Sequence, residues 1–191
     1  MGRTQEDIVR RILTLIALLS AAVWPGYADD ARLIKSVKLA DLEQIITESG
    51  YTITSTGEEG EISVRATTTD GLIFNLIGMA CNTDLVDGCL GISMQVRYDA
   101  DGEETLERIN TANLMWAATS AWYSQGGTDG NSPTVGISRY VILDEGVTFA
   151  NIQTNLVNLL AIAPRAADYI WEVGEYAPDS AGDDEYWDED W

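Results

Sequence analysis

Apolar side chains recur at helical spacing between Lys38 and Gly50. Four of them fall on one stripe of a helix, and polar residues lie between them. Gly50 follows the last of them, as is typical of the residue just after a helix. The four apolar positions are Leu39, Leu42, Ile45 and Ile46. The spacing therefore predicts a short amphipathic helix over residues 38–50.

Alternating apolar and polar residues predict four strands after this helix. Residues 51–55 and 62–66 alternate on either side of a Gly-bearing turn at 57–60, which favours a β-hairpin. Two longer apolar runs follow, at 72–80 and 90–98. We interpret these two runs as the central pair of an antiparallel sheet.

A second helix is predicted after the turn at 99–102. Three carboxylates follow that turn, where they would meet the positive end of a helix dipole. They are Glu103, Glu104 and Glu107. Helical spacing then predicts which side chains of this helix face the core. These are Leu106, Ile109, Asn113, Leu114 and Ala117.

The last third of the chain predicts one more hairpin and a long helix. Residues 121–124 and 134–143 flank a Gly-rich loop, and residues 148–171 carry an apolar helical stripe that we expect Pro164 to kink or split. The stripe consists of Phe149, Ile152, Leu156, Leu159 and Leu160. The order of helix, four strands, helix, two strands and helix predicts an α+β domain, with helices packed against one face of an antiparallel sheet.

The first 28 residues have the pattern of an export signal. Arg3, Arg10 and Arg11 precede an uncharged run at 12–23, and small residues up to Ala28 suit a cleavage site. As a helix, such a run rises about 18 Å, against a hydrocarbon core of roughly 30 Å. We therefore expect a cleaved signal peptide over 1–28 rather than a stable membrane anchor, and an exported protein in the periplasm.

The other end of the chain, residues 174–191, has the composition of a disordered tail. From Glu172 to the end there are nine acidic residues, no basic residue and no helical or strand period. Solubility explains such a charge run most simply. The alternative is recognition of a partner, because Tyr186, Trp187 and Trp191 alternate with the carboxylates.

Charge and composition exclude several classes of function. The 191 residues include 31 Asp and Glu, 11 Lys and Arg and no His, for a formal charge of −20. We expect no nucleic-acid partner, because affinity for phosphate backbones comes mostly from Lys and Arg. A chain without His has no Ser-His-Asp or Cys-His catalytic group and no His-ligated zinc.

No other motif supports catalysis or a metal site. The run Asp99-Ala100-Asp101-Gly102 invites a calcium-loop interpretation, but a loop with this glycine at its sixth position would end on Arg108 instead of Glu. Turn and helix-start preferences explain the two aspartates. We therefore expect no enzyme, no metal site and no cofactor. Binding of divalent cations or a small ligand by the acidic surface is the alternative function.

The two cysteines, Cys81 and Cys89, lie in the part of the chain that we expect to be exported, where thiols tend to be oxidised. They bracket the connection between the two longest strand runs. An even pair at this place favours one disulfide across the mouth of the central hairpin, and two buried free thiols are the alternative.

Several of these features recur together in a known family. Residues 70–74 read Asp-Gly-Leu-Ile-Phe, Gly78 and Cys81 follow, and the later helix carries Asn110 and Asn113 in the order Ile-Asn-Thr-Ala-Asn. In this order and spacing the chain resembles the YbjN domain family, labelled as bacterial sensory transduction regulators. The likeness extends from about Leu33 to Trp171, and we expect the domain to span 33–173.

The resemblance implies a fold similar to that of type III secretion chaperones, which bind other polypeptides and have no known enzymatic chemistry. It therefore implies an unidentified protein partner, and it allows a homodimer. For Asn110 and Asn113 we expect hydrogen bonds to strand ends, because buried amides are usually satisfied by nearby backbone. The predicted function is that of an exported, non-enzymatic protein-interaction or regulatory module.

Overall fold

The structure, a computed structural model, describes residues 33–83, 86–100, 102, 106–126 and 132–175. The expected signal peptide at 1–28 and the expected tail from residue 176 onward lie outside the described residues. The described elements all belong to one compact unit, within residues 32–191.

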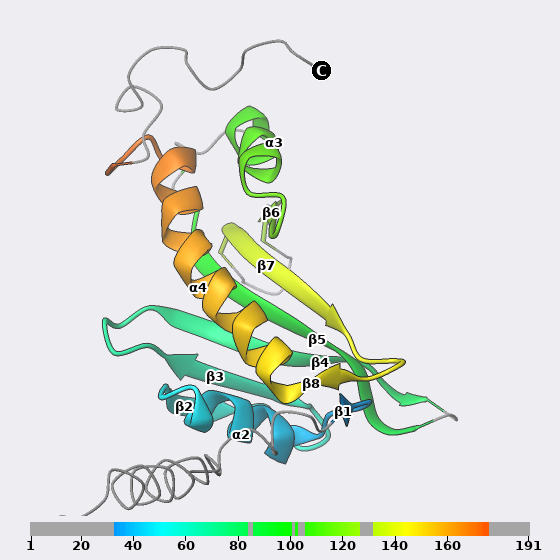
Figure 1. Ribbon diagram of the computed structural model, residues 1–191. Helices are drawn as coiled ribbons and strands as arrows, with labels where there is room; N and C mark the ends of the chain where they lie inside the picture. Colours follow the sequence, from blue (N-terminus) through cyan, green and yellow to red (C-terminus); the bar gives the residue numbers. More distant parts are fainter. Residues whose placement is uncertain (1–32, 84–85, 101, 103–105, 127–131, 176–191) are drawn as a thin grey trace, which may run out of the picture. The chain divides into compact units, whose positions relative to one another are not determined.

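Six strands form one antiparallel sheet in the order β2-β3-β4-β5-β7-β6 (Figure 1). Their bounds are β2 (Thr52–Thr56), β3 (Ser63–Thr67), β4 (Ile73–Thr83), β5 (Val86–Asp99), β6 (Ser120–Ser124) and β7 (Thr134–Ile142). The two longest strands, β4 and β5, are the central pair, as predicted. Two short strands, β1 (Leu33–Ile34) and β8 (Val147–Thr148), pair with each other and were not predicted from the sequence.

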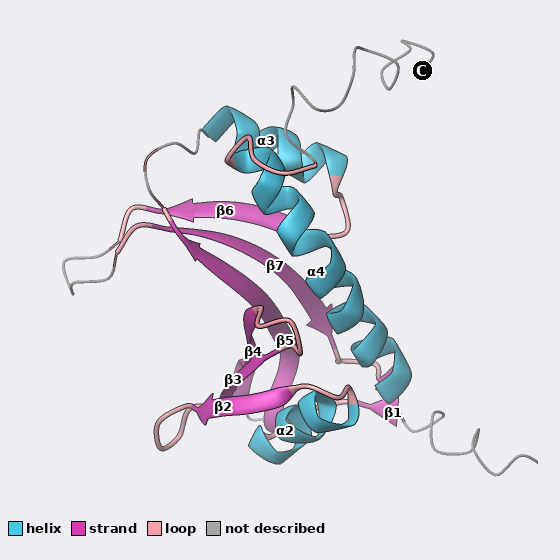
Figure 2. Ribbon diagram, turned by 90° about the vertical axis from the view of Figure 1, so that its left-hand side faces the viewer, coloured by secondary structure: helices cyan, strands magenta, loops and turns pink. Residues whose placement is uncertain are grey.

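Three helices complete the described fold: α2 (Leu39–Glu48), α3 (Leu106–Met115) and α4 (Phe149–Ile170). Helices α2 and α4 lie against the same face of the sheet, which curves around them (Figure 2). Helix α3 packs against β6 and α4 at one end of the sheet. The opposite face of the sheet carries no helix among the described elements. The predicted α+β fold, with helices on one face of an antiparallel sheet, is therefore confirmed.

The core lies between this covered face and the stripes of α2 and α4. On the sheet side it contains alternate residues of the central strands, and on α4 it contains residues three or four apart. Fully buried members include Phe74, Leu76, Ile92, Met94, Val96, Ile137, Ile152, Leu156 and Leu159. Burial of each such side chain contributes about 1.5–3 kcal/mol. These contacts hold the helices on this face of the sheet.

The predicted inner face of α3 is wrong in part. Ile109 is buried, but Leu106 and Leu114 are 72% and 67% exposed, and Ala117 is also exposed. The reason is the position of the helix: α3 packs at the end of the sheet, where it contacts β6 and α4 through a narrow stripe of residues. Its buried residues are Ile109 and the small Ala112, which lie against Val135 and Ile170.

The expected break at Pro164 does not divide α4, which runs as one helix of 22 residues. The proline lies at an exposed position, away from the core. Buried residues flank it on both sides, Leu160 before it and Ala166 after it. Packing of one continuous apolar stripe therefore outweighs the backbone hydrogen bond that proline cannot donate.

Candidate functional site

One face of the sheet lies away from α2 and α4 (Figure 2), and we call the side chains on this face the open face. Alternation along each strand and the cross-strand register define its members. They are Arg65 from β3, Ile73, Asn75, Ile77 and Met79 from β4, Gly91, Ser93, Gln95 and Arg97 from β5, Trp122 from β6, and Gly136, Ser138, Tyr140 and Ile142 from β7. This is the largest surface of the described sheet that no described element covers.

Two aromatic side chains of the open face each reach over a glycine. A Cβ atom at Gly136 would lie 2.0 Å from Cζ2 of Trp122, and a Cβ atom at Gly91 would lie 2.1 Å from the hydroxyl oxygen of Tyr140. Any side chain at either glycine would thus collide with the ring. The two glycines allow the rings to approach the sheet backbone, as glycine in a strand interior often does.

Arg97 is held in place beside one of these rings. Its guanidinium carbon lies 5.6 Å from the ring centroid of Trp122, within the range of a cation–π contact. Its Nε and Nη2 atoms donate hydrogen bonds to Oε1 of Gln95 at 3.0 and 2.8 Å. Nε2 of Gln95 in turn donates to Oγ of Ser93 at 2.9 Å. The guanidinium is therefore oriented, and it has further N–H donors, since arginine carries five.

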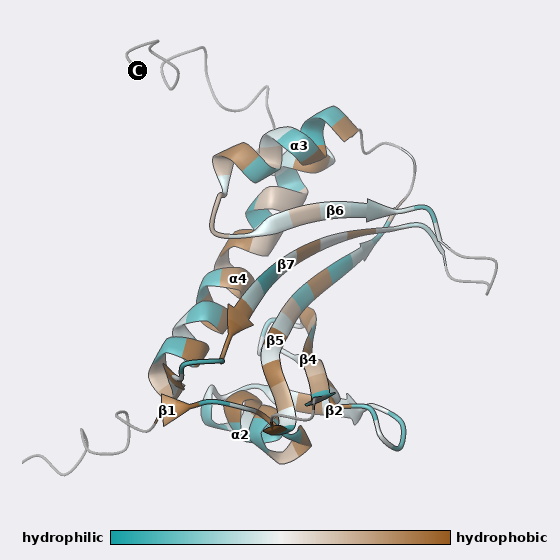
Figure 3. Cartoon of the chain, turned by 90° about the vertical axis from the view of Figure 1, so that its right-hand side faces the viewer, coloured by the Kyte–Doolittle hydropathy of each residue, from teal (hydrophilic) through white to brown (hydrophobic). Residues whose placement is uncertain are grey.

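Apolar side chains gather at the other end of the open face. Met79, Gly91 and Ile142 lie in one row across three strands, and Ile77, Ser93 and Tyr140 lie in the next row. The apolar end of β7 is the brown arrowhead in Figure 3. The most exposed of these side chains are Ile142, Tyr140 and Met79, at 67%, 51% and 40%. Neighbouring exposed apolar side chains of this kind are typical of interaction surfaces.

The charge of the open face differs from that of the whole chain. The open-face side chains defined above include two cations, Arg65 and Arg97, and no carboxylate; Asp99 follows at the end of β5. Neither arginine forms a salt bridge to a carboxylate within the described part of the chain. In a protein with a formal charge of −20, this face therefore presents two arginine side chains that no carboxylate of the described residues pairs with.

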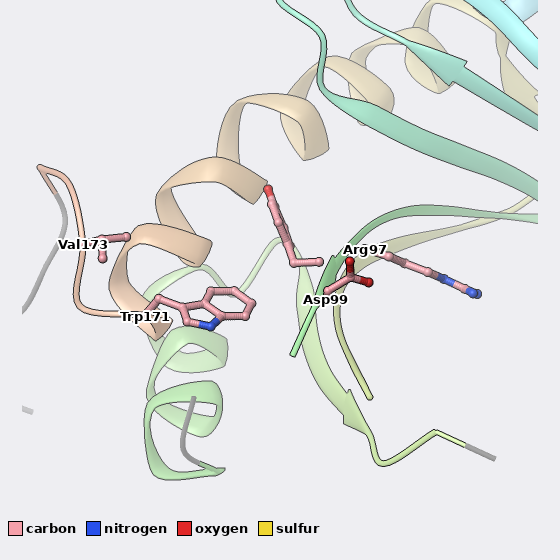
Figure 4. Close-up of a pocket in the computed structure, with 5 residues that line it drawn as sticks. Arg97, Asp99, Trp171 and Val173 are labelled. Carbon is pink, nitrogen blue, oxygen red and sulfur yellow. The ribbon is translucent and has the colours of Figure 1, made fainter. Parts of the chain in front are cut away.

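A pocket of about 530 Å³ lies where β5 and α4 end (Figure 4). Its walls include Tyr98, Trp171 and Val173, and Arg97 and Asp99 also line it. The rings of Tyr98 and Trp171 meet edge to face, with their centroids 5.7 Å apart. The pocket has aromatic walls, and the described chain passes it just before residue 176.

The side chain of Tyr98 is partly buried beside this pocket. Its hydroxyl oxygen is buried and has no hydrogen-bond partner among the described residues. Burial, and to a lesser extent the charge of Asp168, raises the pKa of Tyr98 to about 12. The phenol is therefore neutral at physiological pH.

The sequence predicted a bond between Cys81 and Cys89, and the structure joins their sulfur atoms across β4 and β5. Cys89 is buried in the core, and its backbone exchanges two hydrogen bonds with Val37. A Cβ atom at Gly78 would lie 2.4 Å from Sγ of Cys89, so this glycine leaves the space that the sulfur fills. The disulfide has a structural position and lies apart from the open face.

The two family asparagines behave differently. Asn113 ties α3 to β6, because its Oδ1 accepts from the N–H of Ala121 at 2.7 Å and its Nδ2 donates to the carbonyl of Ala121 at 3.0 Å. Asn110 is exposed, and its side chain makes no hydrogen bond to a strand in the described part of the chain. For Asn110 the expected bond to a strand end is therefore wrong, because its position on α3 faces away from β6.

The aromatic residues of the expected tail, Tyr186, Trp187 and Trp191, lie outside the described residues. Within the described ranges, no three or more Asp, Glu, Cys or His side chains are grouped so as to hold a metal ion. None of the described helices is long and apolar enough to cross a membrane.

Sequence reasoning missed the residues that shape the open face, above all Gly91, Gly136, Trp122 and Arg97. One signal was present, since a glycine inside a strand run often marks a close approach of another group. The ring that approaches each glycine comes from a neighbouring strand, so the partner could not be read from local spacing.

Comparison with known proteins gives one family. The family described as "YbjN: Putative bacterial sensory transduction regulator" matches residues 38–171. The match includes all three described helices and the whole six-stranded sheet. No curated protein sequence matches the chain.

Several solved structures are similar to the chain. "YbjN, a putative transcription regulator from E. coli" is 14% identical, with a TM-score of 0.49, over 70% of this chain and 96% of that one. An uncharacterized protein from Methanothermobacter thermautotrophicus is 8% identical, with a TM-score of 0.47, over 71% and 98%. A chain of the ExsC-ExsE complex is 14% identical, with a TM-score of 0.43, over 69% and 89%.

Proposed function

The chain belongs to the YbjN family, and from this premise we propose that it is a non-enzymatic regulatory module that binds another polypeptide on the open face of its sheet. The family description, a sensory transduction regulator, supports a regulatory role. We further propose that the protein acts after export, since residues 1–28 have the pattern of a signal peptide.

The observation that carries this proposal is the arrangement of Trp122, Arg97 and Tyr140 on the open face. Both rings lie against glycines, and the guanidinium is held by Gln95. Tryptophan, tyrosine and arginine are the residues that most often dominate binding energy at protein interfaces. Side chains that are ordered before binding also lose less entropy on association.

The open face favours a partner segment of defined chemistry. Exposed Ile142 and Met79 fit apolar or aromatic side chains, while Arg97 fits a carboxylate, which it can bind through two parallel hydrogen bonds. We propose a segment that carries apolar or aromatic residues next to Asp or Glu.

Capture of a partner from a periplasmic extract, with crosslinking, tests this function through a matched pair of variants. Ile142 on the open face and Leu114 on α3 are both 67% exposed, so Ile142→Glu and Leu114→Glu add the same charge at equally exposed apolar sites. We expect the first variant to lose the captured protein at least tenfold and the second to retain it. Equal retention by both variants, or no capture by the unchanged chain, contradicts the proposal.

Export has its own test. A chain that starts at residue 1 should appear in the periplasmic fraction shortened by about 28 residues, as a signal peptide of the usual length predicts. Mass spectrometry of that fraction gives the mature N-terminus. An uncut chain in the cytosol contradicts export.

The alternative from the sequence, binding of a divalent cation or a small ligand, has one feature in its favour, the aromatic pocket beside Tyr98. Calorimetry with calcium and with magnesium tests the cation form of this alternative. A heat of binding beyond that of monovalent salt at equal ionic strength supports it, and its absence rejects it.

A further inference from the structure

We propose that the C-terminal residues 176–191 bind in cis to the open face and compete there with the partner. This inference rests on the proposed function, because it names the regulation of the same surface. The carboxylates of the segment would meet Arg97, and its aromatic side chains would lie on the apolar rows of the open face.

The first argument is chemical complementarity. Residues 185–191 read Glu-Tyr-Trp-Asp-Glu-Asp-Trp, which combines aromatic side chains with adjacent carboxylates. The open face offers an oriented guanidinium on Trp122 and exposed apolar side chains such as Tyr140 and Ile142. The segment therefore has the composition that the open face favours in a partner.

The second argument is where the described chain leads. Val173 lines the same pocket as Arg97, so the chain passes the end of β5 just before the segment begins (Figure 4). Its course there is fixed, because the N–H of Val173 donates to the carbonyl of Asp168 at 2.8 Å. Gly174 follows with a φ of +70° and packs closely on the same aspartate. The segment therefore begins near the end of β5, on the side of α4, and it would pass around the end of this strand to reach the Arg97 side chain, which points away from Val173 (Figure 4).

The third argument is reach. The 16 residues from 176 to 191 span at most roughly 53 Å when extended. The 14 residues of β5 span roughly 46 Å. The segment is therefore long enough to pass around the end of β5 and to run along the open face past Arg97 to Tyr140, which pairs with Ser93 within this strand.

Covalent attachment of the segment to the domain offsets the electrostatic repulsion between the two. The domain is acidic overall, which weakens binding of an acidic peptide from solution. A segment attached through a short linker, however, has an effective concentration on the order of 1 mM at a nearby site. With a Kd of about 0.1 mM in trans, the attached segment would be bound about ten times as often as free.

A labelled peptide of residues 176–191 tests the inference by fluorescence anisotropy. It is titrated with the full chain and with a full chain that carries Tyr186→Ser, Trp187→Ser and Trp191→Ser, which we call the tail variant. We expect the peptide to bind the tail variant about tenfold more tightly than the unchanged chain, because the cis competitor has been weakened.

Two further substitutions in the tail variant locate the site. Arg97→Gln should weaken peptide binding at least fivefold, whereas Lys35→Gln removes an exposed cation outside the open face and should leave it unchanged. Circular dichroism shows whether each variant is folded. Equal affinity for the tail variant and the unchanged chain, no binding at 1 mM protein, or equal effects of the two substitutions overturns the inference.

The outcomes also separate this inference from the proposed function. If the peptide binds at Arg97 but Ile142→Glu does not affect capture of a partner, the cis contact stands and the proposed function fails. If Ile142→Glu abolishes capture but the peptide does not bind, the proposed function stands and the inference fails. A second copy of the chain on the open face would instead appear as a concentration-dependent mass in sedimentation, unaffected by the peptide, and also overturns the inference.

Discussion

The two faces of the sheet are built from alternate residues of the same strands, yet they have opposite characters. Along β5, Met94 faces α4 and is fully buried, while its neighbours Gln95 and Ser93 form a polar ladder on the other side. On the covered face, large aliphatic side chains fill the space below two helices. On the open face, two glycines leave room for aromatic side chains to approach the backbone. The first face stabilises the fold, and the second leaves aromatic and polar side chains in contact with one another but uncovered by any described element.

A truncation on each face gives the largest expected contrast. Leu156→Ala on α4 removes a fully buried side chain and should cost about 2–5 kcal/mol of unfolding free energy, because a cavity remains. Ile142→Ala on the open face removes a side chain that is 67% exposed and should cost less than about 1 kcal/mol. Urea denaturation of the two variants measures both values. Equal costs would mean that the open face is covered in solution.

Removal of the disulfide should have the next largest effect on stability. Replacement of both Cys81 and Cys89 by Ser should lower the free energy of unfolding by about 2–3 kcal/mol, since the bond closes a short loop in the unfolded chain. The cost belongs to the covered face, where Cys89 lies, so capture of the partner should persist while the variant is folded. Mass spectrometry after alkylation should show that both cysteines of the unchanged protein resist the reagent. Two freely alkylated thiols would contradict the bond.

The sequence predicted the covered face far better than the open face. Helical spacing within a single element predicts the burial of Leu42, Ile152 and Leu156, and all three are buried. The same spacing predicts where the two helices lie in the sequence. The match over residues 38–171 also confirms the resemblance to the YbjN family. Spacing failed on α3, where the exposed Leu114 looks as apolar as any core residue, because only the tertiary position of the helix decides which stripe is covered.

The open face depends on contacts between strands that are distant in sequence. Trp122 lies above Gly136, and Tyr140 lies above Gly91, 49 residues earlier in the chain. No local period encodes such a pair, and each residue alone is compatible with several roles. The α+β architecture could therefore be predicted, whereas the open face required the cross-strand register.

A substitution at Gly136 tests whether the close approach of the Trp122 ring shapes the open face. Gly136→Ala places a Cβ atom 2.0 Å from Trp122, so the ring must move away, at a cost of about 1–3 kcal/mol in unfolding free energy. The displaced ring also leaves Arg97, so capture of the partner should weaken in parallel. Urea denaturation and the capture assay measure the two effects.

A double substitution is the control for that test. If the cost arises from the ring, Gly136→Ala in a chain that already carries Trp122→Ala should cost less than in the unchanged chain, by about 1 kcal/mol or more. Additive costs of the two substitutions would show that the ring does not limit the space above Gly136.

The smallest expected effect concerns Tyr98, which lies near the end of β5 and packs against the core on the covered side. Its buried hydroxyl has no partner among the described residues, so Tyr98→Phe should raise the free energy of unfolding at pH 7 by about 1 kcal/mol. The ring contact with Trp171 is retained, because phenylalanine keeps the aromatic edge. Urea denaturation of the two proteins measures the difference, and a loss of stability in the variant would mean that the hydroxyl has a partner.

The same residue gives a pH dependence of known sign. Because burial raises the pKa of Tyr98 from 10.0 to about 12, the folded state holds the phenolic proton more tightly than the unfolded state does. The stability that this proton provides is complete below pH 10 and is lost as the pH rises toward 12. At pH 11 the unchanged protein should have lost about 1 kcal/mol from this group, a loss that the phenylalanine variant cannot suffer. The stability advantage of Tyr98→Phe should therefore widen between pH 9 and pH 11. An advantage that stays constant would mean that the phenol is solvated rather than buried.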